Sequence, residues 1–138
     1  MRAASFCIGV MGLLLFFLAM NVSRQRRKNR VSTGMPDDPS HPLYKAVVAH
    51  RNAAEFIPMF SALMLACQLY GAPNWMVAVY GGAVCSRFLH AFSILSYSTV
   101  KRPNPFRVLG AALTYISGLV MAGALVAQAV MQTPSLGR

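Results

Sequence analysis

The sequence predicts an all-α membrane protein in which four antiparallel transmembrane helices form one bundle, a single domain that covers residues 1–138. Three observations predict this fold class. The chain is 56% hydrophobic and only 12% charged, whereas soluble domains carry roughly 25% charged residues. Four apolar stretches are each close in length to the ~20 residues that a helix needs to cross the hydrocarbon core. Most of the charged residues lie between these stretches rather than within them.

The first predicted span covers about residues 3–22 and contains no charged residue. The second covers about residues 45–70 and is apolar apart from a polar cluster near its start. This cluster comprises His50, Arg51, Asn52 and Glu55. The segment Gly71-Ala72-Pro73-Asn74 follows directly, and its turn-forming residues make the second and third spans antiparallel neighbours.

The third predicted span covers about residues 75–97 and holds Arg87 and His90. The fourth covers about residues 108–131 and has no charged residue. Its small residues are Gly110, Gly118, Ala122 and Gly123. Small residues at this spacing favour close helix contact, although they are also frequent in spanning helices that make none.

The positions of lysine and arginine predict the orientation in the membrane, because cytoplasmic loops carry the excess of positive charge. The predicted loops 23–44 and 98–107, with the residues next to them, hold Arg24, Arg26, Arg27, Lys28, Arg30, Lys45, Lys101, Arg102 and Arg107. The opposite side has only Arg2 and Arg138. Both termini are therefore expected on the non-cytoplasmic side. A secretory signal is the alternative for the first span, but the dense basic run after it opposes export of the downstream chain.

Composition also excludes several classes of protein. Disorder requires low hydrophobicity, which this chain does not have. The net charge of +10 fits basic membrane loops better than nucleic-acid binding. The three cysteines, Cys7, Cys67 and Cys85, lie in apolar spans without a paired motif, so neither a disulfide framework nor a metal site is predicted.

Charged residues within the spans are candidates for function, because each costs at least ~2.5–3.5 kcal/mol at mid-helix and must face a partner or a wet cavity. The three such residues are Arg51, Glu55 and Arg87. Arg51 and Glu55 are spaced i,i+4 on one helix face, with Asn52 beside Glu55, so Glu55 is the predicted counter-ion. At the rise of an α-helix, this cluster and that of Arg87 and His90 both lie about 9–15 Å from the basic side.

The two clusters therefore predict one polar site that draws on the second and third spans. Two arginines and one carboxylate leave an excess of positive charge, which favours an anionic ligand. A network of ion pairs that only holds the helices together is the alternative.

Several of these residues form motifs that resemble those of the membrane-associated proteins in eicosanoid and glutathione metabolism, the MAPEG family. The run from Ala49 to Phe60, AHRNAAEFIPMF, resembles the signature of the family's second helix. Arg87-Phe88-Leu89-His90 resembles its Arg-x-x-His in helix three, Pro105-Phe106-Arg107 its Pro-x-Arg at helix four, and Arg24-Gln25-Arg26 its basic exit from helix one. The likeness is to short prokaryotic members and to microsomal glutathione transferase.

This resemblance implies a homotrimer that binds glutathione as co-substrate between subunits near the cytoplasmic side. It implies that the glutathione site comprises Arg24, Arg26, His50, Arg51, Asn52, Glu55, Arg87, His90 and Tyr97. Arg107, with Arg102 as second choice, would lie near the sulfur. Where several family members have a tyrosine four residues after the histidine, this chain has Ile94, and Tyr97 is the nearest hydroxyl.

The resemblance implies a glutathione transferase or peroxidase of a bacterial cytoplasmic membrane that acts on a lipophilic electrophile or hydroperoxide. One alternative is a small four-helix multidrug exporter coupled to protons. Such an exporter is expected to have its working carboxylate in the first helix, which here has no charge within the span. A non-catalytic membrane scaffold is the other alternative. Glutathione-dependent activity of the purified protein separates the first interpretation from both alternatives.

Overall fold

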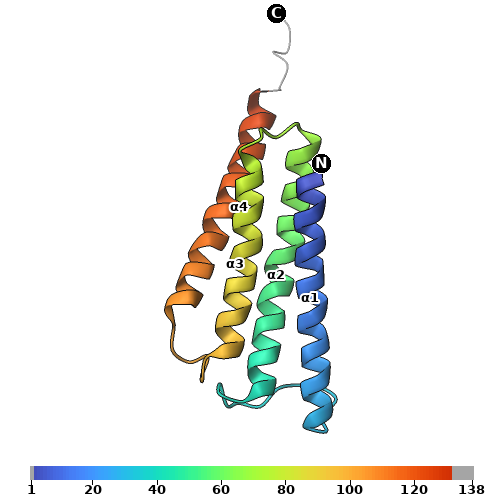
Figure 1. Cartoon of the computed structure of the whole chain (residues 1–138), viewed down its shortest axis with the longest axis vertical. Helices are drawn as coiled ribbons and strands as arrows, with labels where there is room; N and C mark the ends of the chain where they lie inside the picture. Colours follow the sequence, from blue (N-terminus) through green and yellow to red (C-terminus); the bar gives the residue numbers. More distant parts are fainter. Residues whose placement is uncertain (1, 132–138) are drawn as a thin grey trace, which may run out of the picture.

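The computed structural model describes residues 2–131 and contains four long helices (Figure 1). They are α1 (Arg2–Lys28), α2 (Pro42–Leu69), α3 (Met76–Ser96) and α4 (Pro105–Met131). All four are long and apolar enough to cross a membrane, and the described residues contain no strand. The predicted fold class, an all-α bundle of four membrane helices, is confirmed. Arg138, which the charge count placed with Arg2, lies outside the described residues.

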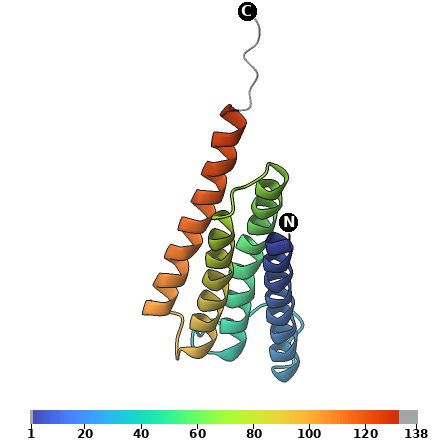
Figure 2. The same ribbon diagram turned by 45° about the horizontal axis from the view of Figure 1, so that its top comes forward.

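The helices lie side by side in the order α1, α2, α3, α4, and each runs antiparallel to the next (Figures 1 and 2). The connections α1–α2 and α3–α4 are at one end of the bundle, and the α2–α3 turn is at the other. α1 packs on α2 and α3, and α4 packs on α3 and α2. Among the described residues α1 and α4 do not touch, so an outer face of each is free of intramolecular contacts.

α1 continues six residues past the predicted end of the first span, so Arg24 to Lys28 lie on a helix rather than in a loop. Three of its last residues, Arg26, Arg27 and Lys28, are basic and stabilise the negative end of the helix dipole. With 27 residues α1 is about 40 Å long, which exceeds the ~30 Å hydrocarbon core. Its basic end therefore extends beyond the apolar layer.

The α2–α3 turn is formed by a Schellman motif at the end of α2. The amide of Ala72 donates to the carbonyl of Cys67 at 2.9 Å, and that of Gly71 donates to Gln68 at 3.2 Å. Gly71 has φ of 72°, a left-handed conformation that glycine adopts without strain. This motif reverses the chain and confirms that α2 and α3 are antiparallel neighbours.

α4 begins with a capped turn. The Oδ1 atom of buried Asn104 accepts a hydrogen bond from the amide of Arg107 at 2.9 Å, and Pro105 follows at the first helical position. We expect Asn104→Ala to lower the free energy of unfolding by about 1 kcal/mol, because an amide of the first turn loses its partner. Denaturation of the purified protein in mild detergent measures this change. Asn104→Asp retains the acceptor and serves as the control; equal loss in both variants would contradict a capping role.

α2 and α3 are also joined at the end of the bundle that holds the basic connections. The Nζ atom of Lys45 donates to the carbonyls of Tyr97 at 3.1 Å and Leu95 at 3.4 Å. These carbonyls lie at the C-terminal end of α3 and accept no hydrogen bond from an amide of the helix, so the positive charge of Lys45 stabilises them. The amide of Val100 donates to the carbonyl of Pro39 at 3.2 Å and joins the two connections.

α3 and α4 approach closely at Gly110. A Cβ atom at this position would lie 3.0 Å from the backbone nitrogen of His90 and 3.2 Å from its Cα. Gly118 makes only ordinary contact with Phe60, and a Cβ at Gly123 would meet nothing within 4 Å. Close packing of α4 therefore occurs at Gly110, next to His90, and this contact brings the polar residues of the two helices together.

Candidate functional site

The centre of the polar region is Arg87, whose side chain on α3 is only 2% exposed. Its Nη1 atom donates to Oδ1 of Asn52 on α2 at 2.9 Å, and its Nη2 atom donates to Oγ1 of Thr114 on α4 at 2.7 Å. One guanidinium therefore joins three helices. The bond to Asn52 shows that the polar clusters of the second and third spans meet, as their equal depth predicts.

The charge of Arg87 has no acidic partner within residues 2–131. Its Nε atom is buried without a hydrogen-bond partner there, and its guanidinium lies 4.8 Å from the centre of the Phe56 ring. An aromatic ring attracts a cation but does not neutralise it. A buried positive charge without a carboxylate attracts an anion.

Thr114 is a member of this cluster that sequence reasoning missed. Its buried hydroxyl accepts from Arg87 and lies 2.7 Å from the carbonyl of Gly110 and 3.1 Å from Oγ of Ser86. Its depth agrees with that of Arg87, because Thr114 lies about 14 Å from the start of α4 and Arg87 about 14 Å from the end of α3 at 1.5 Å per residue. The fourth span contains no charge, so nothing in its sequence draws attention to this hydroxyl.

Arg51, Asn52 and Glu55 line a concave site of ≈ 190 Å³ on α2, together with Val48. Asn52 is half-buried, and Arg51 and Glu55 are exposed. The prediction that Glu55 is the counter-ion of Arg51 is wrong for this chain alone, because no ion pair joins the two within the described residues. No other part of residues 2–131 covers these two exposed side chains, so burial does not force them to pair.

His90 is buried directly beside this cluster. Its side chain is 8% exposed, and its Nδ1 atom has no hydrogen-bond partner among the described residues. The charges of Arg87 and Arg107 both act on the imidazole. Arg107 itself is half-buried, and its Nη1 atom donates to the carbonyl of Val100 at 2.8 Å. Of the two candidates for the sulfur site, Arg107 is therefore the one next to the polar cluster.

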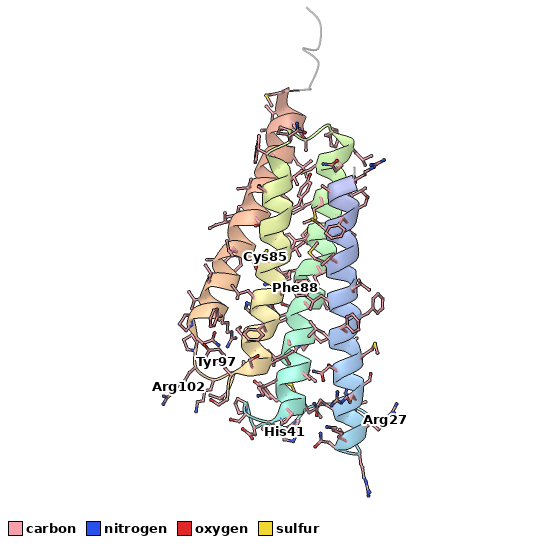
Figure 3. The ribbon with its side chains drawn as sticks, in the orientation of Figure 1. Arg27, His41, Cys85, Phe88, Tyr97 and Arg102 are labelled. Atoms are coloured by element: carbon pink, nitrogen blue, oxygen red, sulfur yellow. The ribbon has the colours of Figure 1, made fainter. Side chains whose placement is uncertain are left out.

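The other candidates lie farther from Arg87. Arg102 is exposed in the α3–α4 connection and points away from the bundle, and Tyr97 lies at the end of α3 (Figure 3). The Tyr97 ring packs against Phe106, with centroids 6.4 Å apart. It makes no described contact with Arg87 or His90. Ile94, at the position of the family tyrosine, is buried in the core.

Arg24, Arg26 and His50 are not brought to the cluster by any described contact. Arg24 is exposed on the outer face of α1, where it borders a shallow concave surface with Phe17, Met20 and Asn21. Arg26 is half-buried, with an Nε atom that lacks a partner among residues 2–131. His50 is half-buried next to Arg51.

An apolar groove of ≈ 380 Å³ runs between α2 and α4. Its lining comprises Phe56, Met59, Phe60, Leu63, Thr114, Tyr115, Gly118, Leu119 and Ala122. Phe56 and Thr114 also contact Arg87, so the groove adjoins the polar cluster. The groove therefore lies beside a buried guanidinium.

Fold and site together define a multi-pass membrane protein with a cationic site inside its helix bundle. The chain belongs to the MAPEG family, whose sequence profile matches residues 4–127. Its curated relatives include the inner membrane protein YecN of Escherichia coli strain K12, which is 36% identical over 81 residues. YecN of Escherichia coli O6:H1 shows the same identity. The matched part covers 58% of this chain and 60% of each relative.

Proposed function

We propose that the chain is an integral-membrane glutathione-dependent transferase or peroxidase. The observation that carries this proposal is Arg87, a buried guanidinium without an acidic partner among residues 2–131. It lies between two concave surfaces. One is the site on α2 lined by Arg51, Asn52 and Glu55, called the α2 cavity below, and the other is the apolar groove between α2 and α4. Family membership supports glutathione as the anion, because the family includes glutathione transferases. The relatives named inner membrane proteins support a bacterial inner membrane as the location.

The α2 cavity has the charges that the γ-glutamyl end of glutathione requires. Glu55 is an acceptor for the ammonium group, whereas Arg51 is a cation for the carboxylate beside it. Asn52 lines the same cavity. A zwitterion therefore pairs with both of these charges, which have no ion-pair partner within residues 2–131.

A cavity of ≈ 190 Å³ is smaller than the ~300 Å³ at which ligand pockets begin, so one chain holds only part of the tripeptide. We propose that a homotrimer completes the site. A neighbouring copy then brings its α1 end, with Arg24 and Arg26, over the exposed α2 face of the first. This also covers Arg51 and Glu55, whose exposure at this depth of a bilayer is costly.

The proposed chemistry is stabilisation of the glutathione thiolate. A thiol with a pKa near ~8.5 is mostly protonated at neutral pH, and each unit by which a site lowers that pKa requires about 1.4 kcal/mol. Arg107, with Arg102 as second choice, is the proposed cation near the sulfur. Arg87 adds positive field to the same region.

The thiolate is the nucleophile in either reaction. In a transferase step the sulfur forms a bond to an electrophilic carbon as the leaving group departs with its electron pair. In a peroxidase step the sulfur attacks a hydroperoxide oxygen and an alkoxide leaves; a second glutathione then releases glutathione disulfide, so that two thiols are oxidised and the hydroperoxide is reduced to alcohol and water. The apolar groove between α2 and α4 suits a lipophilic second substrate.

The basic connections lie at one end of the bundle, and the positive-inside rule places that end on the cytoplasmic side. We therefore propose that the N-terminus faces away from the cytoplasm. Labelling by an impermeant reagent in intact cells of a cysteine introduced at Asn74, which is exposed in the α2–α3 turn at the same end of the bundle as the N-terminus, tests this orientation.

The test of the proposed function is the ultraviolet absorption of thiolate on mixing protein and glutathione at neutral pH. We expect a saturable increase in thiolate absorbance with the wild-type protein, because the cationic site favours the ionised sulfur. S-methylglutathione, which has no thiol to ionise, is the control and gives no signal. If glutathione binds without this increase, the protein is a glutathione-binding scaffold and not an enzyme of the proposed type.

A further inference from the structure

The amide of Asn52 has a defined direction in the structure. Its Oδ1 atom accepts the hydrogen bond from Nη1 of Arg87 at 2.9 Å. Every hydrogen-bonding group of a guanidinium is a donor, so the oxygen and not the NH₂ of the amide must face Arg87. The NH₂ group then points away from Arg87, and Asn52 presents it as a donor at the α2 cavity, which it lines with Arg51 and Glu55.

Arg87 can orient Asn52 only if its own position is defined. Two contacts from other helices define it: Thr114 accepts from Nη2 at 2.7 Å, and the Phe56 ring lies 4.8 Å from the guanidinium carbon. The single hydrogen of the Thr114 hydroxyl is used toward Gly110 or Ser86, which leaves its oxygen lone pairs for Arg87. Valine has the shape of threonine but cannot accept this bond.

We propose that Thr114 is a positioning residue of the glutathione site: by holding Arg87, it makes Asn52 present an NH₂ donor in the cavity that Arg51 and Glu55 also line. The α2 cavity then offers a cation, a donor and an acceptor. A carboxylate fits the first two and an ammonium group fits the third, so the network selects a free α-amino acid end. The identity of the ligand as glutathione rests on the proposed function. The hydrogen bonds among Thr114, Arg87 and Asn52 are present without any ligand.

The experiment compares Thr114→Val with Thr114→Ser, which keeps the oxygen. Ser93→Ala is the matched control, because it removes a buried hydroxyl of α3 that bonds only to the carbonyl of His90. Each variant is titrated with glutathione and with the analogue in which the α-carboxylate of the γ-glutamyl residue is a carboxamide. We expect Thr114→Val to weaken glutathione binding about tenfold or more and to reduce its preference over the amide. Thr114→Ser and Ser93→Ala are expected to retain the wild-type affinity for glutathione and the preference for glutathione over the amide.

A combination with Asn52→Ala separates positioning from general destabilisation. If Thr114 acts through Asn52, the double variant Asn52→Ala/Thr114→Val binds glutathione no more weakly than Asn52→Ala alone. Additive losses, or failure of Thr114→Ser to restore affinity, would overturn the proposal and leave Thr114 a purely structural residue.

A measurement without ligand distinguishes this proposal from the proposed function. The side-chain amide resonances of Asn52, identified by their loss in Asn52→Ala, are recorded by nuclear magnetic resonance in nanodiscs. We expect them to shift in Thr114→Val and to stay in place in Thr114→Ser and Ser93→Ala. If the wild-type protein binds no glutathione but the resonances shift, the proposed function fails and the positioning role stands. If the resonances do not shift, the positioning role is wrong whether or not glutathione binds.

Discussion

Glu55→Gln is expected to reduce glutathione affinity by about 100-fold or more, and Arg51→Gln to reduce it similarly. Glutamine keeps the shape of the glutamate side chain but removes the charge that pairs with the ligand's ammonium group. Loss of a hydrogen-bonded charge of this kind costs about 3 kcal/mol, which corresponds to roughly two powers of ten in affinity. Both side chains line the α2 cavity and have no ion-pair partner within residues 2–131, so no internal partner compensates for the change.

Isothermal titration calorimetry with protein in nanodiscs measures this effect. Lys101→Ala is the control, because Lys101 is exposed in the α3–α4 connection at the basic end of the bundle and lies outside the proposed site. Both site variants should keep the helical circular dichroism spectrum of the wild-type protein, because the two side chains are exposed in the single chain and its helix packing does not depend on them. Wild-type affinity in Arg51→Gln would remove that residue from the glutathione site.

Gly110→Val is expected to lower the free energy of unfolding by about 3 kcal/mol or more. A Cβ at this position already lies 3.0 Å from the backbone nitrogen of His90, and the two methyl groups of valine add volume at the same contact. The atoms that the new side chain would meet belong to the backbone of His90, and they cannot move aside unless α3 itself is displaced. Since Thr114 lies one turn later on α4, separation of the helices also lengthens its bond to Arg87.

Reversible unfolding in mixed detergent, followed by circular dichroism, measures this loss. Gly123→Val is the matched control, because a Cβ there meets nothing within 4 Å on the same helix. We also expect Gly110→Ala to be destabilising, although alanine is normally favoured over glycine in a helix by about 1 kcal/mol. Equal stabilities of the Gly110 and Gly123 variants would show that the close contact of α3 with α4 contributes nothing to the fold.

Much of the site could be predicted from spacing alone. Charges in apolar spans are rare and costly, which singles out Arg51, Glu55 and Arg87, and a count of helical rise places Asn52 and Arg87 at one depth. The bond between these two side chains agrees with that count. Thr114 could not be found in this way, because a hydroxyl in an uncharged span is unremarkable until the structure places it against a buried guanidinium.

Other features depend on which face of each helix is covered. The i,i+4 spacing of Arg51 and Glu55 predicts an ion pair, but both side chains are exposed and unpaired within the described chain. Small residues along α4 are equivalent candidates for close contact in the sequence, and only packing against His90 distinguishes Gly110 from Gly123. The continuation of α1 to Lys28 is not evident from the sequence, because a run of basic residues is typical of a loop as well.

The amino-acid sequence by itself determined that four helices cross an apolar layer and that cations gather at one end, because hydrophobicity, helix length and charge distribution are properties of each segment alone. The tertiary structure decided which side chains meet. Contact between Arg87, Asn52 and Thr114 requires the rotation and separation of three helices, and these depend on close packing at positions such as Gly110. Periodicity along one helix carries no information about that relative placement.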